Sequence, residues 1–155
     1  MVAVVGPATC TDNQADIAEA VGKIIAERGA IVVCGGRGGV MEAVCKGAVS
    51  SGGITVGILP GTDANEGNPY LSVSLPTGLG EARNTLIARA GQAMIAIGGS
   101  YGTLSEIALA LKFGRKVVGL ETWSASDHIG RQLGLLWAKD ALAAVKMALA
   151  QVNHA

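Results

Sequence analysis

Short apolar runs rich in Val and Ile alternate along the chain with longer Ala-rich segments that carry charge on one face. This alternation is typical of repeated strand–helix units and predicts a parallel sheet covered by helices. The apolar runs are short and mostly lack alternating polarity, as expected of buried parallel strands. We therefore expect six strands, at Val2–Val5, Ile31–Cys34, Ile54–Leu59, Leu71–Leu75, Ala93–Ile97 and Lys116–Leu120.

The segments between these strands are expected to be helical. The predicted helices are Asn13–Arg28, Gly39–Ser51, Gly80–Ala90, Thr103–Phe113 and a terminal stretch, Asp127–Gln151, with a break near Gly134. The exception is Pro60–Pro69, whose turn-forming composition predicts a long crossing loop.

Composition and length agree with this pattern. Half of the residues are hydrophobic but only 3% are aromatic, so Ala, Val, Ile and Leu must build the core. The length, 155 residues, is usual for one domain. We expect residues 1–155 to form a single Rossmann-like α/β domain, with three layers (α/β/α) and a parallel sheet of about six to seven strands. Right-handed crossovers most simply give the strand order 3-2-1-4-5-6, with a ligand crevice at the carboxyl ends of the first and fourth strands.

Four loops converge at that crevice, and they hold 10 of the 23 glycines of the chain: Gly6–Thr11, Gly35–Gly39, Pro76–Gly80 and Gly98–Gly102. The second loop joins a strand directly to a helix, which places backbone N–H groups and the positive end of the helix dipole where a phosphate can bind. An arginine in the same loop adds charge-assisted hydrogen bonds. The alternative is that the glycines only permit a tight turn. The candidate binding residues of the first two loops are Gly6, Gly35, Gly36, Arg37, Gly38 and Gly39.

The loop after the fifth strand is a second strand-to-helix junction of the same kind. Its candidate binding residues are Gly98, Gly99, Ser100, Tyr101, Gly102 and Thr103. Thr103 and Glu106 fit a capping box, in which the two side chains satisfy backbone donors at the helix start. The Glu106 carboxylate could equally face the ligand and act on a sugar or its glycosidic bond. The sequence leaves both roles open.

Arg83 is predicted in the first turn of a helix, where a cation opposes the helix dipole. A bound anion would explain its position, and the alternative is an ordinary solvated arginine.

Several classes of function are excluded by composition and motifs. The formal charge is zero, so neither nucleic acid nor an anionic membrane surface is an expected partner. Three cysteines without ligand spacing indicate reduced thiols and no structural metal, and no apolar stretch reaches membrane-spanning length. We expect a cytoplasmic protein without a resident metal or cofactor. Dinucleotide and P-loop motifs are absent, since GxGxxG counted from Gly36 ends on Met41 and no Gly-Lys-Ser/Thr follows a strand.

The segments GGRGGVMEA, TGLGEARN and GGSYGTLSE resemble the LOG-like branch of the SLOG superfamily, and the resemblance covers nearly the whole chain. That family includes phosphoribohydrolases that release a free base from nucleoside 5′-monophosphates, molybdenum-cofactor carrier proteins, and members labelled lysine decarboxylases. The carrier-like subgroup has recognisable counterparts of TGLG-x-ARN and of the EIALALK helix.

The resemblance implies two functions. A carrier-like protein would bind a phosphorylated nucleotide-like or pterin-like molecule without turnover. A phosphoribohydrolase would use Glu106 and Arg83 as catalytic residues, which match the motif PGGxGTxxE and its upstream arginine. This sequence departs from that motif at Gly98, Ser100 and Asn84, where the hydrolases have proline, glycine and usually lysine.

Two further expectations concern chemistry and assembly. A pyridoxal-phosphate lysine decarboxylase is disfavoured because none of the four loops holds a lysine for a Schiff base. A homo-oligomer, dimer or tetramer, is expected through the Ala/Leu-rich helices Glu106–Lys112 and Asp140–Leu149, unless these faces only cover the sheet.

Overall fold

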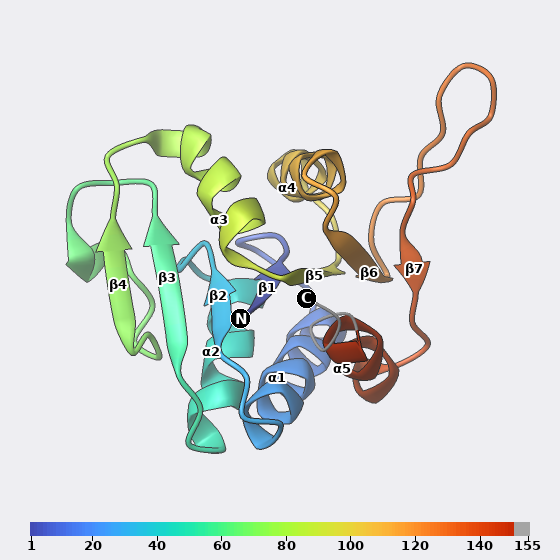
Figure 1. The fold of residues 1–155 in the computed structure, drawn as a ribbon. Coiled ribbons are helices and arrows are strands. Elements are labelled where there is room, and N and C mark those ends of the chain that lie inside the picture. The colour runs from blue at the N-terminus through green and yellow to red at the C-terminus, as the bar shows by residue number, and fades with distance from the viewer. Residues whose placement is uncertain (151–155) are drawn as a thin grey trace.

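The computed structural model describes residues 1–150, so Gln151 at the predicted end of the terminal helix lies outside the described residues. The parallel strands form one sheet (Figure 1). They are β1 (Val2–Val5), β2 (Val32–Cys34), β3 (Thr55–Leu59), β4 (Val73–Pro76), β5 (Ala93–Ile97), β6 (Lys116–Leu120) and β7 (Leu136–Trp137). The helical elements are α1 (Asp12–Glu27), α2 (Val40–Ser50), η1 (Ala64–Glu66), η2 (Gly80–Arg83), α3 (Asn84–Ala90), α4 (Tyr101–Lys112) and α5 (Ala141–Ala150).

The strand order is β4-β3-β2-β1-β5-β6-β7, and every pair is parallel. If the edge strand β4 is left out, the remaining order is β3-β2-β1-β5-β6-β7. This is the doubly wound arrangement expected from the sequence, and the direction of winding reverses between β1 and β5. The predicted Rossmann-like α/β fold is therefore confirmed. Ligands bind such sheets where the order reverses, at the carboxyl ends of the strands.

Alternate residues of the central strands point to opposite faces of the sheet and belong to two apolar clusters, one on each face. Val2 and Val4 of β1 pack with α1, α2 and α5, whereas Ala3 and Val5 pack with α3 and α4. Figure 1 shows the same division, with α3 and α4 on one face of the sheet and α1, α2 and α5 on the other. Because both faces of β1 and β5 are covered, these strands need no polar alternation, which is why their apolar runs were recognisable in the sequence.

The predicted place of the fourth strand is wrong. The Leu71–Leu75 prediction corresponds to β4, which pairs with β3 at the edge of the sheet and not with β1. The loop Pro60–Pro69 contains only the short turn η1 and no longer helix. It connects β3 to β4, which lies beside β3 on the side away from β1. The strand next to β1 on the other side is β5, so the crevice lies between the ends of β1 and β5. The segment η2–α3 then crosses back over the sheet from β4 to β5.

The prediction of a helix over Asp127–Gln151 is also wrong in its first half. Residues 121–140 are mostly irregular and contain β7, which extends the sheet beside β6. Gly130, with a φ of 83°, ends any helical path there, and Ser126 and Gln132 form an antiparallel bridge. Helix α5 begins only at Ala141, after Asp140 accepts a hydrogen bond from the Ala143 amide.

The described part of the chain contains no helix whose length and hydropathy would let it cross a bilayer. The three cysteines carry free thiols, and two of them, Cys34 and Cys45, are buried with their sulfur atoms 3.6 Å apart. In residues 1–150 no group of three His, Cys, Asp or Glu side chains is arranged as metal ligands.

Candidate functional site

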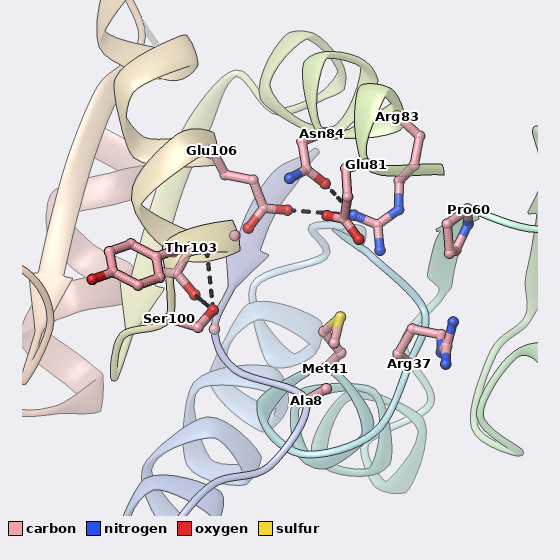
Figure 2. Close-up of a pocket in the computed structure, with 13 residues that line it drawn as sticks. Ala8, Arg37, Met41, Pro60, Glu81, Arg83, Asn84, Ser100, Thr103 and Glu106 are labelled. Carbon is pink, nitrogen blue, oxygen red and sulfur yellow. Dashed lines mark hydrogen bonds and ion pairs between the residues drawn. The ribbon is translucent and has the colours of Figure 1, made fainter. Parts of the chain in front are cut away.

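A cavity of about 520 Å³ opens at the carboxyl ends of β1 and β5, where the winding of the sheet reverses. We call it the strand-end cavity. Figure 2 shows its walls, which come from the loop after β1, the start of α2, the segment η2–α3 and the start of α4. It is lined by Gly6, Ala8, Arg37, Met41, Pro60, Glu81, Arg83, Asn84, Ser100, Tyr101, Gly102, Thr103 and Glu106.

The cavity brings together eight of the fourteen residues expected at a site. These are Gly6, Arg37, Arg83, Ser100, Tyr101, Gly102, Thr103 and Glu106. The other six do not line it: Gly35, Gly36, Gly38, Gly39, Gly98 and Gly99. Sequence reasoning missed Ala8, Met41, Pro60, Glu81 and Asn84 as lining residues.

Five of the six glycines that do not line the cavity, all but Gly38, lie where a Cβ atom would come within 3.0 Å of a neighbouring group. A Cβ atom on Gly39, whose φ is 60°, would overlap the carbonyl oxygen of Pro7. A Cβ on Gly35 would lie 2.9 Å from Nη2 of Arg83. The loop Gly35–Gly39 is also fixed by a residue outside it, because Nδ2 of Asn68 donates to the carbonyl oxygen of Arg37 at 3.1 Å. At these positions the alternative reading, a tight turn, describes the glycines better than direct ligand contact.

Helix α4 presents free backbone donors to the cavity. Within residues 1–150 the N–H groups of Tyr101 and Gly102, the first two of the helix, have no protein acceptor. The third, that of Thr103, donates to Oγ of Ser100 at 3.3 Å. Such free donors at a helix start, together with the helix dipole, favour an anion.

The capping box predicted for Thr103 and Glu106 is wrong. The N-cap of α4 is Ser100, whose extended backbone (φ −128°, ψ 173°) and side chain start the helix two residues earlier than expected. Thr103 is therefore the third helical residue, and its hydroxyl lies 3.1 Å from that of Ser100. This placement puts Glu106 in the second turn, where its side chain faces the cavity (Figure 2).

Glu106 forms a buried ion pair with Arg83. Nη1 of Arg83 lies 3.8 Å from Oε1 of Glu106, and 8% of each side chain is exposed. Burial raises the pKa of the Glu106 carboxyl to about 7, against the opposing effect of the Arg83 cation and with a further contribution from the Glu81 carboxylate. Desolvation thus outweighs the ion pair, as is common for buried pairs at this separation.

Arg83 is held in place by several groups. Its Nη1 donates to Oδ1 of Asn84, and its Nη2 donates to the carbonyl oxygen of Gly35 at 3.4 Å. Its Nε is buried and has no partner among residues 1–150. A largely buried guanidinium that lines a cavity is suited to an anionic ligand.

Asn84 connects Arg83 to helix α4. It is 4% exposed, and its Nδ2 donates to Oγ of Ser105 at 2.9 Å. Ser105 in turn donates to the carbonyl oxygen of Gly102 at 2.7 Å. This chain of hydrogen bonds fixes the two walls of the cavity relative to one another. In the sequence, Asn84 was marked only by its position directly after Arg83 in the segment TGLGEARN.

The edge of the cavity near Tyr101 is aromatic. Tyr101 is 83% exposed and stacks on Trp123, with ring centroids 5.8 Å apart. The Trp123 indole donates to the carbonyl oxygen of Ser100 at 2.9 Å, so the stacked pair is tied to the start of α4.

The model of the SLOG cluster4 family matches residues 1–145. The chain belongs to the SLOG cluster4 family. This confirms the resemblance to SLOG proteins inferred from GGRGGVMEA, TGLGEARN and GGSYGTLSE.

Two solved structures are similar to this SLOG cluster4 protein along nearly its whole length. One is the molybdenum cofactor binding protein from Rippkaea orientalis, with a TM-score of 0.88 and 31% identity over 97% of this chain and 96% of that one. The other is the molybdenum cofactor carrier protein from Chlamydomonas reinhardtii, with a TM-score of 0.86 and 34% identity over 98% of each chain. An uncharacterized protein from Archaeoglobus fulgidus is 44% identical over 120 residues, which cover 77% of this chain and 79% of that protein.

Proposed function

We propose that this protein binds a phosphorylated small molecule, pterin-like or nucleotide-like, in the strand-end cavity and carries it without turnover. The observation on which the proposal depends is Arg83, a largely buried arginine, 7% exposed, whose side chain lines the cavity. The free N–H groups at the start of α4 supply neutral donors to the same anion, and Arg37 adds a second cation at the rim.

The rest of the cavity suits a planar ring. Met41, Pro60 and Tyr101 give it apolar walls, and its volume of about 520 Å³ is typical of small-molecule sites. The two similar solved structures are described as molybdenum cofactor binding or carrier proteins. That cofactor is a pterin with a phosphate group, and it would be cargo here. Both halves of such a molecule have matching chemistry in the cavity.

A second candidate function is hydrolysis of nucleoside 5′-monophosphates. It is favoured by Glu106, whose pKa of about 7 is suited to proton transfer near neutral pH. In this reaction Glu106 would activate water or stabilise charge on the sugar, while Arg83 would hold the phosphate. The departures from the hydrolase motif at Gly98, Ser100 and Asn84 weigh against it.

The two functions are separated by measuring binding and base release on the same samples. Calorimetry with GMP, AMP, inorganic phosphate and a pterin phosphomonoester gives the affinities, and chromatography detects free base. Carriage predicts binding of the phosphorylated probes with no base released. Release of base that stops in Glu106→Gln would establish the hydrolase instead.

The anion site itself is tested by Arg37→Ala. We expect phosphate binding to weaken by about tenfold, since one charge-assisted contact is lost. Arg28→Ala is the matched control, because Arg28 is exposed at the end of α1 and does not line the cavity. Equal affinities in both variants and the wild type would contradict an anion site at Arg37.

A further inference from the structure

Glu81 is a carboxylate on the wall of a cavity that otherwise favours anions. It lies on η2, and Figure 2 shows the side chains of Glu81 and Arg83 both directed into the cavity. Glu81 is close enough to Glu106 to raise the pKa of that group. A negative charge in this position weakens the binding of any phosphate nearby. Phosphate binding alone therefore does not explain why a carboxylate, that of Glu81, lies on the cavity wall.

The described residues also provide no structural partner for this carboxylate. The ion pairs within residues 1–150 include Glu106 with Arg83 but leave Glu81 out, although Arg83 is only two positions away on the same element. The hydrogen bonds found in the same part of the chain do not use its side chain either. Glu81 is exposed, so its acceptor oxygens meet water in the free protein and are accessible to donors on a ligand.

We infer that Glu81 reads the donor edge of the ligand's ring, and that the ligand carries a 2-amino-4-oxopyrimidine ring, as pterins and guanine do. This inference rests on the proposed function. The ring presents an N–H and an adjacent amino group side by side, which match the two oxygens of one carboxylate. Adenine presents an amino group beside a ring nitrogen that is an acceptor, and this acceptor would face a carboxylate oxygen. Glu81 is then a specificity-determining residue.

Vicinal hydroxyl groups of a ribose offer the same pair of donors to a carboxylate. GMP and AMP have the same ribose and the same phosphate and differ only in the base. A comparison of these two nucleotides therefore separates recognition of the ring from recognition of the sugar. Inorganic phosphate, which has neither, reports on the anion site alone.

The experiment measures the affinities of GMP, AMP and inorganic phosphate for the wild type, Glu81→Gln and Glu27→Gln by calorimetry. Glu27 is an exposed residue at the far end of α1 and is the matched control. We expect the wild type to prefer GMP over AMP by about tenfold, the discrimination of one good bidentate pair. In Glu81→Gln, GMP should bind about tenfold more weakly while phosphate binds as tightly as before or more tightly.

Opposite effects on GMP and on phosphate would not arise from a general loss of structure, which weakens both. An equal loss for GMP and AMP in Glu81→Gln would assign the carboxylate to the ribose and overturn the inference. An unchanged preference for GMP would overturn it as well. If GMP and AMP bind equally while phosphate still binds to the wild type, the inference fails and the proposed anion site stands. If none of the three probes binds to the wild type, both fail.

Discussion

The guanidinium of Arg83 and the carboxylate of Glu106 come from different crossover segments, η2 and α4, and meet 3.8 Å apart inside the strand-end cavity. Because the pKa of Glu106 is about 7, its carboxyl is about half protonated at neutral pH. The pair therefore keeps part of the positive charge of Arg83. A fully ionised pair would offer a phosphate much less attraction.

The raised pKa of Glu106 predicts a pH dependence of stability. Between about 4.5, the ordinary value, and about 7, the folded protein keeps a proton that the unfolded chain has released. The free energy of unfolding therefore falls as pH rises through this range, by up to roughly 3 kcal/mol, and stays low above it. Glu106→Gln should lose this part of the slope.

Urea unfolding at about pH 5 and about pH 8 measures most of the effect, since these two values span most of the range in which only the folded protein holds the proton. The informative quantity is the difference between the two proteins, because all other titrating groups are shared. Glu27→Gln, which alters an exposed carboxylate, should keep the wild-type slope. Identical slopes in Glu106→Gln and the wild type would show that Glu106 does not titrate in this range.

Arg83→Lys should weaken both the fold and the anion site, although the charge is retained. A lysine has no planar fork to contact the Asn84 amide, the Gly35 carbonyl and Glu106 together. We expect a loss of roughly 2 kcal/mol in the free energy of unfolding and clearly weaker phosphate binding. Arg28→Lys at the exposed end of α1 should change neither. Wild-type values for Arg83→Lys would mean that only its charge matters.

The sequence predicted the central part of the fold well, for a physical reason. Val2–Val5, Ala93–Ile97 and Lys116–Leu120 were expected at the bounds observed, because strands covered on both sides appear as short unbroken apolar runs. The edge strands were harder. β4 is largely exposed and β7 has only two residues, so neither has an apolar run that fixes its neighbour in the sheet. Their positions depend on which connections carry a crossover helix.

The sequence could predict those residues of the candidate site that are charged or that lie at the start of a helix. Arg83 and Glu106 were singled out as charged groups near helix starts, and both line the cavity. Met41 and Asn84 carry no such signal, since an apolar residue and an amide on helices are usually only packing residues. Their contribution depends on how η2–α3 folds over the end of the sheet. The correct cap of α4 depends on the extended backbone of Ser100, which residue types alone did not distinguish from Thr103.

Ser100→Ala tests that assignment. Loss of the hydroxyl removes the acceptor for the Thr103 amide and should lower the free energy of unfolding by about 1 kcal/mol. Ser124→Ala, an exposed serine beside Trp123, is the control and should be neutral. Thermal or urea unfolding gives both values. If Ser100→Ala leaves the free energy of unfolding unchanged while Thr103→Ala lowers it, the N-cap of α4 is Thr103 and not Ser100.

Gly39 should tolerate substitution far less well than Gly52, although both have a positive φ. Gly52→Ala adds a methyl group where nothing lies within 4 Å, so it bears only the backbone cost of roughly 1–2 kcal/mol. Gly39→Ala meets the carbonyl oxygen of Pro7, to which the Val40 amide also donates at 3.1 Å, so α2 and the loop after β1 must separate. We expect a loss of roughly 3 kcal/mol or more and a parallel loss of phosphate binding. Equal urea midpoints for the two variants would show that this close approach does not shape the cavity.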